Sequence, residues 1–153
     1  MTAAGMHLAQ VNIGRLVAPL DSEQLHGFTS RLDEINALAD GWPGFVWRLQ
    51  GDGDSATDLR PFKDDTILVN MSVWGDVEAL RDYVYRSDHL QLLRERRQYF
   101  QHMREAFTAL WWVPAGHRPT TTEAWERLMH LRRHGPTTHA FTFGQTFGPV
   151  TPG

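Results

Sequence analysis

The chain of 153 residues has no cysteine, which excludes disulfides, thiolate metal sites and cysteine nucleophiles and fits a reducing cytoplasm. Its net charge of −3 leaves no basic field to attract nucleic acid or an anionic membrane surface. No run approaches the roughly 18 apolar residues of a membrane span. The segment Met1–His7 lacks the charged and apolar regions of a signal peptide. We therefore expect a cytoplasmic protein without nucleic-acid or membrane partners.

Several familiar site motifs are missing as well. There is no Walker loop, no G-x-G-x-x-G and no G-x-S-x-G. Asp52 and Asp54 resemble the start of a calcium loop, but position 12 of that loop is Lys63 instead of glutamate. His130 and His134 are four residues apart on a predicted helix, without an identified third ligand. We predict no metal site.

Aromatic residues, in contrast, are abundant, with six tryptophans and eight phenylalanines. This number suits either a large core or a cavity for a flat hydrophobic ligand. The length is that of one domain with a substantial core. We expect a flexible N-terminus over 1–6, a single domain over 7–147 and a flexible tail over 148–153.

Hydrophobic periodicity predicts alternating strands and helices. The predicted strands are His7–Val17, Phe45–Leu49, Thr66–Trp74, Leu110–Val113 and a short Ala140–Phe147, the last being a strand or an ordered tail. Helical segments are predicted after Pro19, over 77–107 as one long or a broken helix, and after the capping box of Thr120 and Glu123. The first six elements have the order of a split βαβ, or ferredoxin-like, α+β sandwich. A further helix and strand follow at the C-terminal end.

The third predicted strand is substantially apolar on both faces. Ile67, Val69, Met71 and Val73 alternate with Leu68, Asn70, Ser72 and Trp74. Helices in this fold lie on one face of the sheet, so the other face needs a separate cover. A second copy of the sheet is the simplest cover, and we predict a homodimer through this open face.

The candidate site begins with polar residues on this strand. Asn70 and Ser72 share a face with Trp74, and Gln10 and Asn12 of the first strand join them if the faces align. Such groups either pair across the sheet or polarise a bound carbonyl or enolate. His89 lies on an otherwise apolar helical stripe that continues through Arg96, Phe100 and Phe107. It is either satisfied by a backbone carbonyl or water, or acts as a general base.

For each of the other candidate residues, a purely structural role stands beside the functional one. Arg48 alternates with Trp47 and is either an edge residue or a pocket residue. Arg96 either belongs to a solvated helix face or meets a carboxylate. The aromatic side chains are either core or cavity wall, and Trp111 and Trp112 point to opposite faces. The predicted substrate-binding set is Asn12, Trp47, Arg48, Ser72, Trp74, Tyr83, Arg96, Phe100 and Trp112, with His89 and Asn70 as catalytic residues.

Longer motifs resemble the bacterial DUF3291 family. They are Leu8–Arg15, Gly44–Leu49, Val69–Trp74, Tyr83–His89, Leu110–His117, His134–Thr137 and Ala140–Phe143. The family is a domain of unknown function placed among dimeric α/β-barrel proteins. The resemblance implies a ferredoxin-like protomer that dimerises sheet to sheet. It also implies relatives such as antibiotic-biosynthesis monooxygenases, polyketide cyclases and haem-binding barrel enzymes. It supplies no catalytic residues.

Together, the polar set and the resemblance predict a cofactor-independent monooxygenase or cyclase. Its substrate is expected to be a small aromatic or polyketide-like molecule bound between sheet and helices. One alternative is a noncovalent haem- or ligand-binding module with His89 as the ligand, since covalent c-type attachment needs cysteine. The other is an interaction dimer without catalysis, which a fully packed interior would favour.

Overall fold

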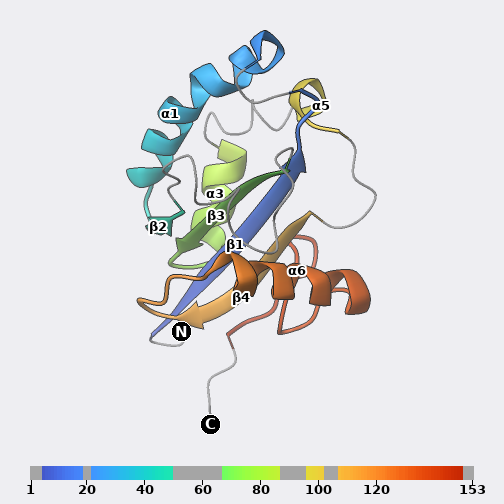
Figure 1. The fold of residues 1–153 in the computed structure, drawn as a ribbon. Coiled ribbons are helices and arrows are strands. Elements are labelled where there is room, and N and C mark those ends of the chain that lie inside the picture. Colours follow the sequence, from blue (N-terminus) through green and yellow to red (C-terminus); the bar gives the residue numbers. More distant parts are fainter. Residues whose placement is uncertain (1–4, 19–21, 50–66, 87–95, 102–106, 150–153) are drawn as a thin grey trace.

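A computed structural model describes residues 5–18, 22–49, 67–86, 96–101 and 107–149 (Figure 1). The strands in these ranges are β1 (Met6–Arg15), β2 (Phe45–Arg48), β3 (Ile67–Trp74) and β4 (Thr108–Pro114). The helices are the 3₁₀ turn η1 (Glu23–Leu25), α1 (His26–Asp40), α3 (Val77–Arg86), α5 (Arg96–Tyr99) and α6 (Thr121–His134). Asp52, Asp54 and Lys63 lie outside the described residues.

The four strands form one antiparallel sheet in the order β2-β3-β1-β4. Helix α1 follows β1 and helix α3 follows β3, so each helix separates two strands in the chain. This is the ferredoxin-like arrangement, and the predicted α+β fold is confirmed. The two central strands, β1 and β3, contain most of the buried strand residues because neighbouring strands flank them on both sides.

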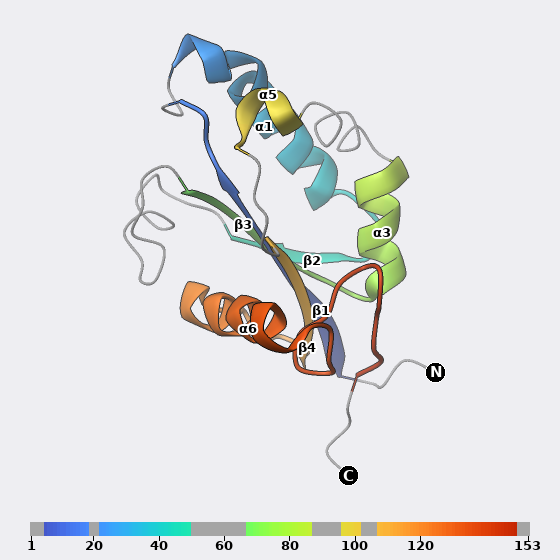
Figure 2. The ribbon, with the colours of Figure 1, turned by 90° about the vertical axis from the view of Figure 1, so that its right-hand side faces the viewer.

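Helices cover the sheet on both of its faces. Figure 2 shows α1 and α3 on one side of the sheet and α6 on the other. The odd-numbered side chains Val11, Met71 and Trp111 pack in one cluster with Leu128 of α6. The even-numbered side chains Leu8, Trp74 and Leu110 pack in a second cluster, with Ile35 of α1 and Leu80 of α3. The period-2 alternation of the strands therefore separates two distinct cores.

The position of α6 changes the expectation of an open sheet face. Ala124, Leu128 and Leu131 of this helix are buried against odd-numbered residues of β1 and β4. Thr120 caps the helix as predicted, because its Oγ1 accepts a hydrogen bond of 3.1 Å from the Glu123 N–H. The chain itself therefore covers the half of that face formed by β1 and β4.

Strict alternation along the second strand would place Phe45 and Trp47 on one face, but the structure separates them. Phe45 pairs with Trp74 but Trp47 pairs with Val73, so a bulge interrupts the register between them. A bulge inserts one residue and moves the following side chains to the opposite face. As a result, Trp47 packs with the odd-numbered cluster, whereas Phe45 packs with the even-numbered one.

The helical region predicted over 77–107 is broken near its end. Helix α5 ends at Tyr99, and Phe100 forms an isolated antiparallel bridge with Leu16. The Gln101 N–H then donates to the Arg15 carbonyl at 2.8 Å. Pairing with the end of β1 thus satisfies the backbone here, which overrides the helical spacing of the side chains.

The C-terminal segment forms bridges instead of a full strand. Phe141 bridges to Leu110 of β4, and Thr142 bridges to Gln145 within a tight turn. No helix among the described residues is long and apolar enough to cross a lipid bilayer.

Candidate functional site

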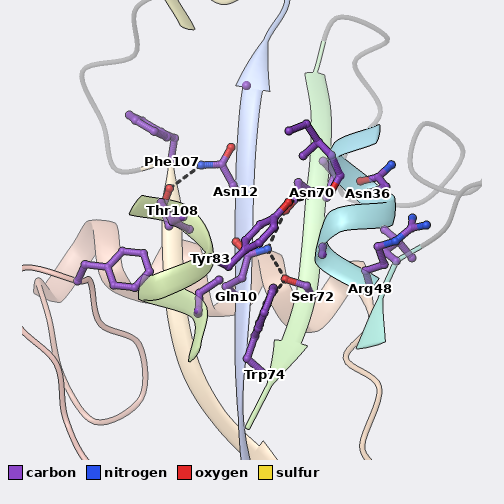
Figure 3. A pocket seen from close by; sticks show the side chains of 18 of the residues that line it. Gln10, Asn12, Asn36, Arg48, Asn70, Ser72, Trp74, Tyr83, Phe107 and Thr108 are labelled. Carbon is purple, nitrogen blue, oxygen red and sulfur yellow. Dashed lines mark hydrogen bonds between the residues drawn. The ribbon is translucent and has the colours of Figure 1, made fainter. Parts of the chain in front are cut away.

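A cavity of about 550 Å³ lies between the even-numbered face of the sheet and helices α1 and α3 (Figure 3). Its floor is formed by β1, β3 and the start of β4, and its walls come from the helices. A volume of this size is ordinary for a small-molecule site. The interior is therefore not fully packed, which disfavours the non-catalytic interpretation that a solid core would have supported.

Strand register arranges the floor of the cavity in rows. One row across the sheet contains Arg48, Ser72 and Gln10, and the next contains Asn70, Asn12 and Thr108. Neighbouring strands lie about 4.8 Å apart and rows on one face about 7 Å apart, so this polar band is compact. Phe45, Trp74, Leu8 and Trp112 make the apolar row beside it.

Hydrogen bonds within the polar band determine which of its groups remain available as donors. Gln10 Nε2 donates to Asn70 Oδ1 at 2.8 Å and to Ser72 Oγ at 2.8 Å. Trp74 Nε1 also donates to Ser72 Oγ, at 2.8 Å. Two N–H groups thus occupy the lone pairs of the Ser72 hydroxyl, which leaves its O–H as a donor. The Asn70 carboxamide accepts through its oxygen, which leaves its NH₂ group as a donor.

Asn70 is the most accessible residue of this band. It is exposed although it belongs to a central strand, because its side chain faces the cavity. Asn12, directly opposite on β1, donates from Nδ2 to Thr108 Oγ1 at 2.7 Å. The band therefore contains uncharged hydrogen-bonding groups that a ligand in the cavity can reach.

Arg48 is the only charged residue among the described residues that line the cavity. Its Nε donates to Asp40 Oδ1 at 2.7 Å and its Nη2 to Asp40 Oδ2 at 3.2 Å. Asp40 ends α1, so this bidentate pair ties the helix to β2. Because Asp40 balances the guanidinium, the cavity favours a neutral ligand over an anion.

Tyr83 forms the wall that faces the band. It is buried, and its hydroxyl donates to the Ile35 carbonyl at 3.1 Å. Burial raises the pKa of Tyr83 well above its usual value, and nearby Arg48 and Asp40 act on it in opposite directions. The phenol therefore stays protonated and acts as a structural donor.

Aromatic rings complete the cavity around the polar band. Trp74 lies 5.1 Å from Tyr83 and 5.3 Å from Phe45, measured between ring centroids. Trp42 makes an edge contact with Tyr83 at 5.8 Å. Such rings offer flat apolar surfaces, so the cavity has the shape and chemistry to hold a planar molecule.

The structure brings together seven of the residues predicted from the sequence. Asn12, Arg48, Asn70, Ser72, Trp74, Tyr83 and Phe100 all line the cavity. Phe100 reaches it because it lies against Gly14, where a Cβ atom would clash with its ring. Its contribution therefore depends on the bridge to β1, not on a helical stripe.

Two other predicted residues, Trp47 and Trp112, are not among the residues that line the cavity. The bulge in β2 turns Trp47 away from the cavity and into the cluster that packs on α6. Trp112 packs beside the cavity, with its Nε1 donating to the Phe147 carbonyl at 2.7 Å, and is not among the lining residues. Arg96 begins α5. His89, the predicted base or haem ligand, lies outside the described residues.

Sequence reasoning omitted several lining residues from its candidate set. Thr108 belongs to the second polar row, and the pairing of β1 with β4 is the signal that identifies it. Gln10, which was expected to join the site if the faces align, does line the cavity. Thr142, Phe143 and Gly144 come from the C-terminal turn. Nothing in their local pattern indicates a contact with a cavity that distant strands and helices enclose.

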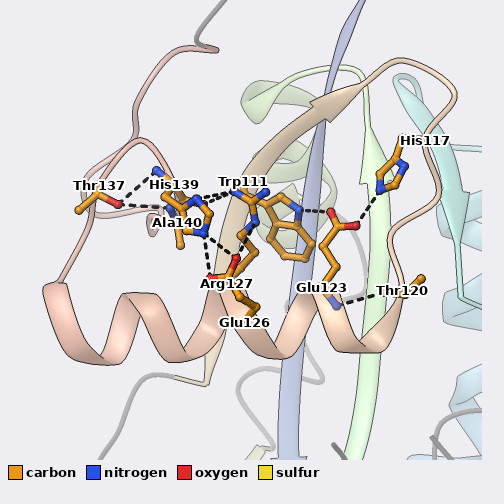
Figure 4. A network of polar contacts seen from close by, with 9 residues as sticks. All are labelled: Trp111, His117, Thr120, Glu123, Glu126, Arg127, Thr137, His139 and Ala140. Carbon is orange, nitrogen blue, oxygen red and sulfur yellow. Dashed lines mark hydrogen bonds and ion pairs between the residues drawn. The ribbon is translucent and has the colours of Figure 1, made fainter. Parts of the chain in front are cut away.

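A second group of polar residues lies on α6, away from the cavity (Figure 4). Glu123 accepts from Trp111 Nε1 at 2.8 Å and contacts His117 Nε2 at 2.7 Å. Further along the helix, Glu126 contacts His139 Nε2 at 2.7 Å. Among the described residues, no group of three or more His, Cys, Asp or Glu side chains is arranged to hold a metal ion. These contacts instead join α6 to β4 and to the C-terminal segment.

Comparisons with known proteins complete the description of the site. The sequence model described as "Domain of unknown function (DUF3291)" matches residues 7–152. No curated protein matches the chain. The structure of SnoaB, a cofactor-independent oxygenase from Streptomyces nogalater, is 22% identical with a TM-score of 0.47, covering 75% of this chain and 97% of SnoaB. PA3566 from Pseudomonas aeruginosa is 13% identical with a TM-score of 0.49, covering 75% of this chain and 99% of PA3566. Because both TM-scores lie below 0.5, a function for this chain has to be argued from its own cavity.

Proposed function

The chain belongs to the DUF3291 family, and we propose that it is an enzyme acting on a small aromatic or polyketide-like molecule in the cavity. The reaction is that of a cofactor-independent monooxygenase or of a cyclase. One observation carries this proposal: a band of hydrogen-bonding groups, uncharged apart from Arg48 in its pair with Asp40, crosses the floor of an aromatic cavity of about 550 Å³. The aromatic walls can pack against the ring system of a ligand, and the polar band can form hydrogen bonds with the oxygen atoms of that ligand.

Both reactions begin with the same chemical step. A base removes a proton from a carbon that is activated by an adjacent or conjugated carbonyl group, and negative charge develops on the carbonyl oxygen. Donors fixed in advance around that oxygen stabilise the enolate more than the ketone. The NH₂ group of Asn70 and the O–H of Ser72 are directed donors of this kind. We retain His89 as the proposed base on the sequence argument.

The two reactions differ in what the enolate does next. In a monooxygenase its electrons reduce O₂, so that an activated CH₂ carbon becomes a carbonyl, one oxygen atom enters the product and the other leaves as water. In a cyclase the carbanion attacks a second carbonyl of the same molecule. Neither route requires a bound redox group, because the substrate supplies the electrons.

Anthrone is a suitable first probe, because it is planar and has a CH₂ group activated by a conjugated carbonyl. Oxidation to anthraquinone under air, followed by absorbance, tests the oxygenase reaction. We expect Asn70→Ala to lower kcat by about 10²-fold, as for the loss of one oxyanion donor. Gln145→Ala, at an exposed residue of the C-terminal turn, is the matched control and should keep full activity.

Two results would count against the proposal. If anthrone and 1-hydroxyanthraquinone both fail to bind at saturating protein, the cavity is not a site for planar aromatics. If they bind but Asn70→Ala changes neither affinity nor turnover, the polar band does not act on the ligand. Binding with no turnover of any activated ketone would instead favour a ligand-binding module.

We also propose that the protein forms a homodimer through the part of the sheet that α6 leaves uncovered. Trp47, Leu49 and Ile67 are only partly buried on that face, and Val46 beside them is 41% exposed. A second copy would bury this apolar surface. Light scattering at micromolar concentration should give the mass of a dimer, and Trp47→Glu should shift it toward the monomer. A monomeric mass for the unaltered chain would refute this assembly.

A further inference from the structure

The C-terminal turn over 142–145 forms one end of the cavity, although it lies outside the ferredoxin-like core. Thr142, Phe143 and Gly144 all line the cavity. The turn closes where the Gln145 N–H donates to the Thr142 carbonyl at 3.3 Å. Figure 2 shows this segment, in red, passing beside α3. A part of the chain beyond the common fold therefore shapes the space available to a ligand.

The turn is held firmly at both of its ends. Phe141 exchanges two backbone hydrogen bonds of 2.8 Å with Leu110 of β4, and its side chain is fully buried. On the other side, the Phe147 carbonyl accepts from Trp112 Nε1 at 2.7 Å. Upstream, His139 is tied to Glu126 of α6 (Figure 4). These anchors make the turn a fixed wall for the cavity.

Phe143, at the tip of the turn, contacts two residues of α3. The Arg81 guanidinium carbon lies 5.7 Å from the centre of the Phe143 ring, and Arg81 Nη2 donates to the Phe143 carbonyl at 3.4 Å. Tyr85 makes an edge contact with the same ring at 6.0 Å. A cation over a ring face and an edge-on ring both favour one orientation of the phenyl group.

The same end of the cavity meets solvent. Tyr85 lines the cavity although the residue is 49% exposed, and Gly144 also lines it and is exposed. Because these residues belong both to the cavity wall and to the solvent-exposed surface, the cavity opens at this end. Phe143, half-buried between them, therefore lies where a long ligand would extend beyond the walls.

From this arrangement we infer that Phe143 is a specificity-determining residue that limits how far a planar ligand extends toward α3. Arg81 acts as a positioning residue that fixes the ring. This inference rests on the proposed function, because it assumes a planar aromatic ligand in the cavity. It adds that the C-terminal turn, and not the polar band, selects ligands by length.

The test compares dissociation constants for two probes of different length, 1-naphthol and 1-hydroxyanthraquinone. Phe143→Ala removes the ring and should shift the ratio of the two affinities toward the longer probe by about tenfold, the scale of a small steric change in a pocket. Phe143→Trp enlarges the ring and should shift the ratio the other way. Gln145→Ala, in the same turn but not lining the cavity, should leave the ratio unchanged.

Arg81→Gln provides a check on the positioning role. It keeps the aromatic ring but removes the cation over it, so it should move the ratio in the same direction as Phe143→Ala and by less. Glu78→Gln, at another exposed position of α3, should have no effect. Circular dichroism establishes that each variant is folded before its affinities are compared.

The possible outcomes distinguish a failure of the proposed function from a failure of the role assigned to Phe143. If neither probe binds to the unaltered protein, both are refuted. If both probes bind and Asn70→Ala weakens them, while the affinity ratio is the same in the alanine and tryptophan variants of Phe143, the proposed function stands and the role of Phe143 is refuted. Opposite shifts in those two variants support the inference.

Discussion

The indole N–H of Trp74 donates a hydrogen bond of 2.8 Å to the hydroxyl of Ser72, two residues earlier on β3. The two side chains meet because residues i and i+2 of a strand lie on the same face. An indole nitrogen can only donate, so this contact fixes the Ser72 oxygen as an acceptor. Gln10 takes up the second lone pair at 2.8 Å. Toward a ligand, the Ser72 hydroxyl can therefore act only as a hydrogen-bond donor through its O–H.

Replacing this hydroxyl should cost both stability and ligand affinity. In Ser72→Ala, the Trp74 indole N–H and one Gln10 N–H lose a buried acceptor, which should lower the free energy of unfolding by about 1–3 kcal/mol. Urea denaturation monitored by circular dichroism measures the change. Ser72→Thr keeps the hydroxyl and serves as the control. Equal stability of the alanine variant and the unaltered protein would contradict the network.

Tyr83 should make the protein sensitive to alkaline pH. Burial raises the pKa of its phenol in the folded state, whereas the unfolded chain titrates near its usual value of about 10. The unfolded state therefore releases this proton first, so stability is retained below about pH 10 and lost progressively above it. Tyr83→Phe removes the group, and its free energy of unfolding should fall less between pH 9 and about 11.

The decisive quantity for Tyr83 is the difference between the pH dependence of the Tyr83→Phe variant and that of the unaltered protein. Tyr85→Phe is the matched control, since Tyr85 is 49% exposed. A pH dependence of Tyr83→Phe that parallels that of the unaltered protein would show that the phenol titrates normally.

The bond between Trp111 and Glu123 should be important for holding α6 on the sheet. Trp111 is fully buried, and its Nε1 donates to Glu123 Oε2 at 2.8 Å. Glu123→Ala leaves this N–H without an acceptor and should lower the free energy of unfolding by about 1–3 kcal/mol. Glu123→Gln keeps an acceptor oxygen and should lose less. If thermal denaturation ranks the two variants equally, the carboxylate is not what satisfies the indole.

Much of the fold could be predicted because it follows from local alternation. In β1 and β3, apolar residues recur at every second position, and such a pattern predicts a strand directly. The order of strands and helices then selected the ferredoxin-like sandwich. Asn70, Ser72 and Trp74 were found for the same reason: neighbours of one strand share a face whatever the strand pairs with.

The remaining features depend on contacts between distant segments. The bulge that redirects Trp47 arises from the pairing of β2 with β3, which local spacing cannot reveal. Phe100 leaves its helical stripe because its backbone pairs with Leu16, far away in sequence. Phe143 reaches the cavity only because Phe141 is anchored on β4. In each case a hydrogen bond to a distant backbone outweighs the side-chain pattern.

Three histidines near the end of α6 should make stability depend on pH in the acidic range. The His130 ring lies 4.5 Å from the His134 ring and 4.5 Å from the His139 ring. Desolvation lowers the pKa of His130, and repulsion from His139, His134 and Arg127 adds to this effect. Glu126 acts in the opposite direction. In the folded state, His130 therefore resists protonation.

The unfolded chain takes up a proton on His130 near its usual pKa of about 6.5, before the folded chain does. The stabilising contribution of neutral His130 is therefore complete above that pH and is lost as the pH falls below it. The His130→Gln variant lacks this pH-dependent contribution, so its free energy of unfolding should fall less between pH 8 and about 5. His117→Gln controls for a histidine outside the cluster, because His117 contacts Glu123 near the start of α6. Parallel pH dependences for His130→Gln and the unaltered protein in urea denaturation would show that His130 does not resist protonation, and a steeper fall in the variant would reverse the assigned sign.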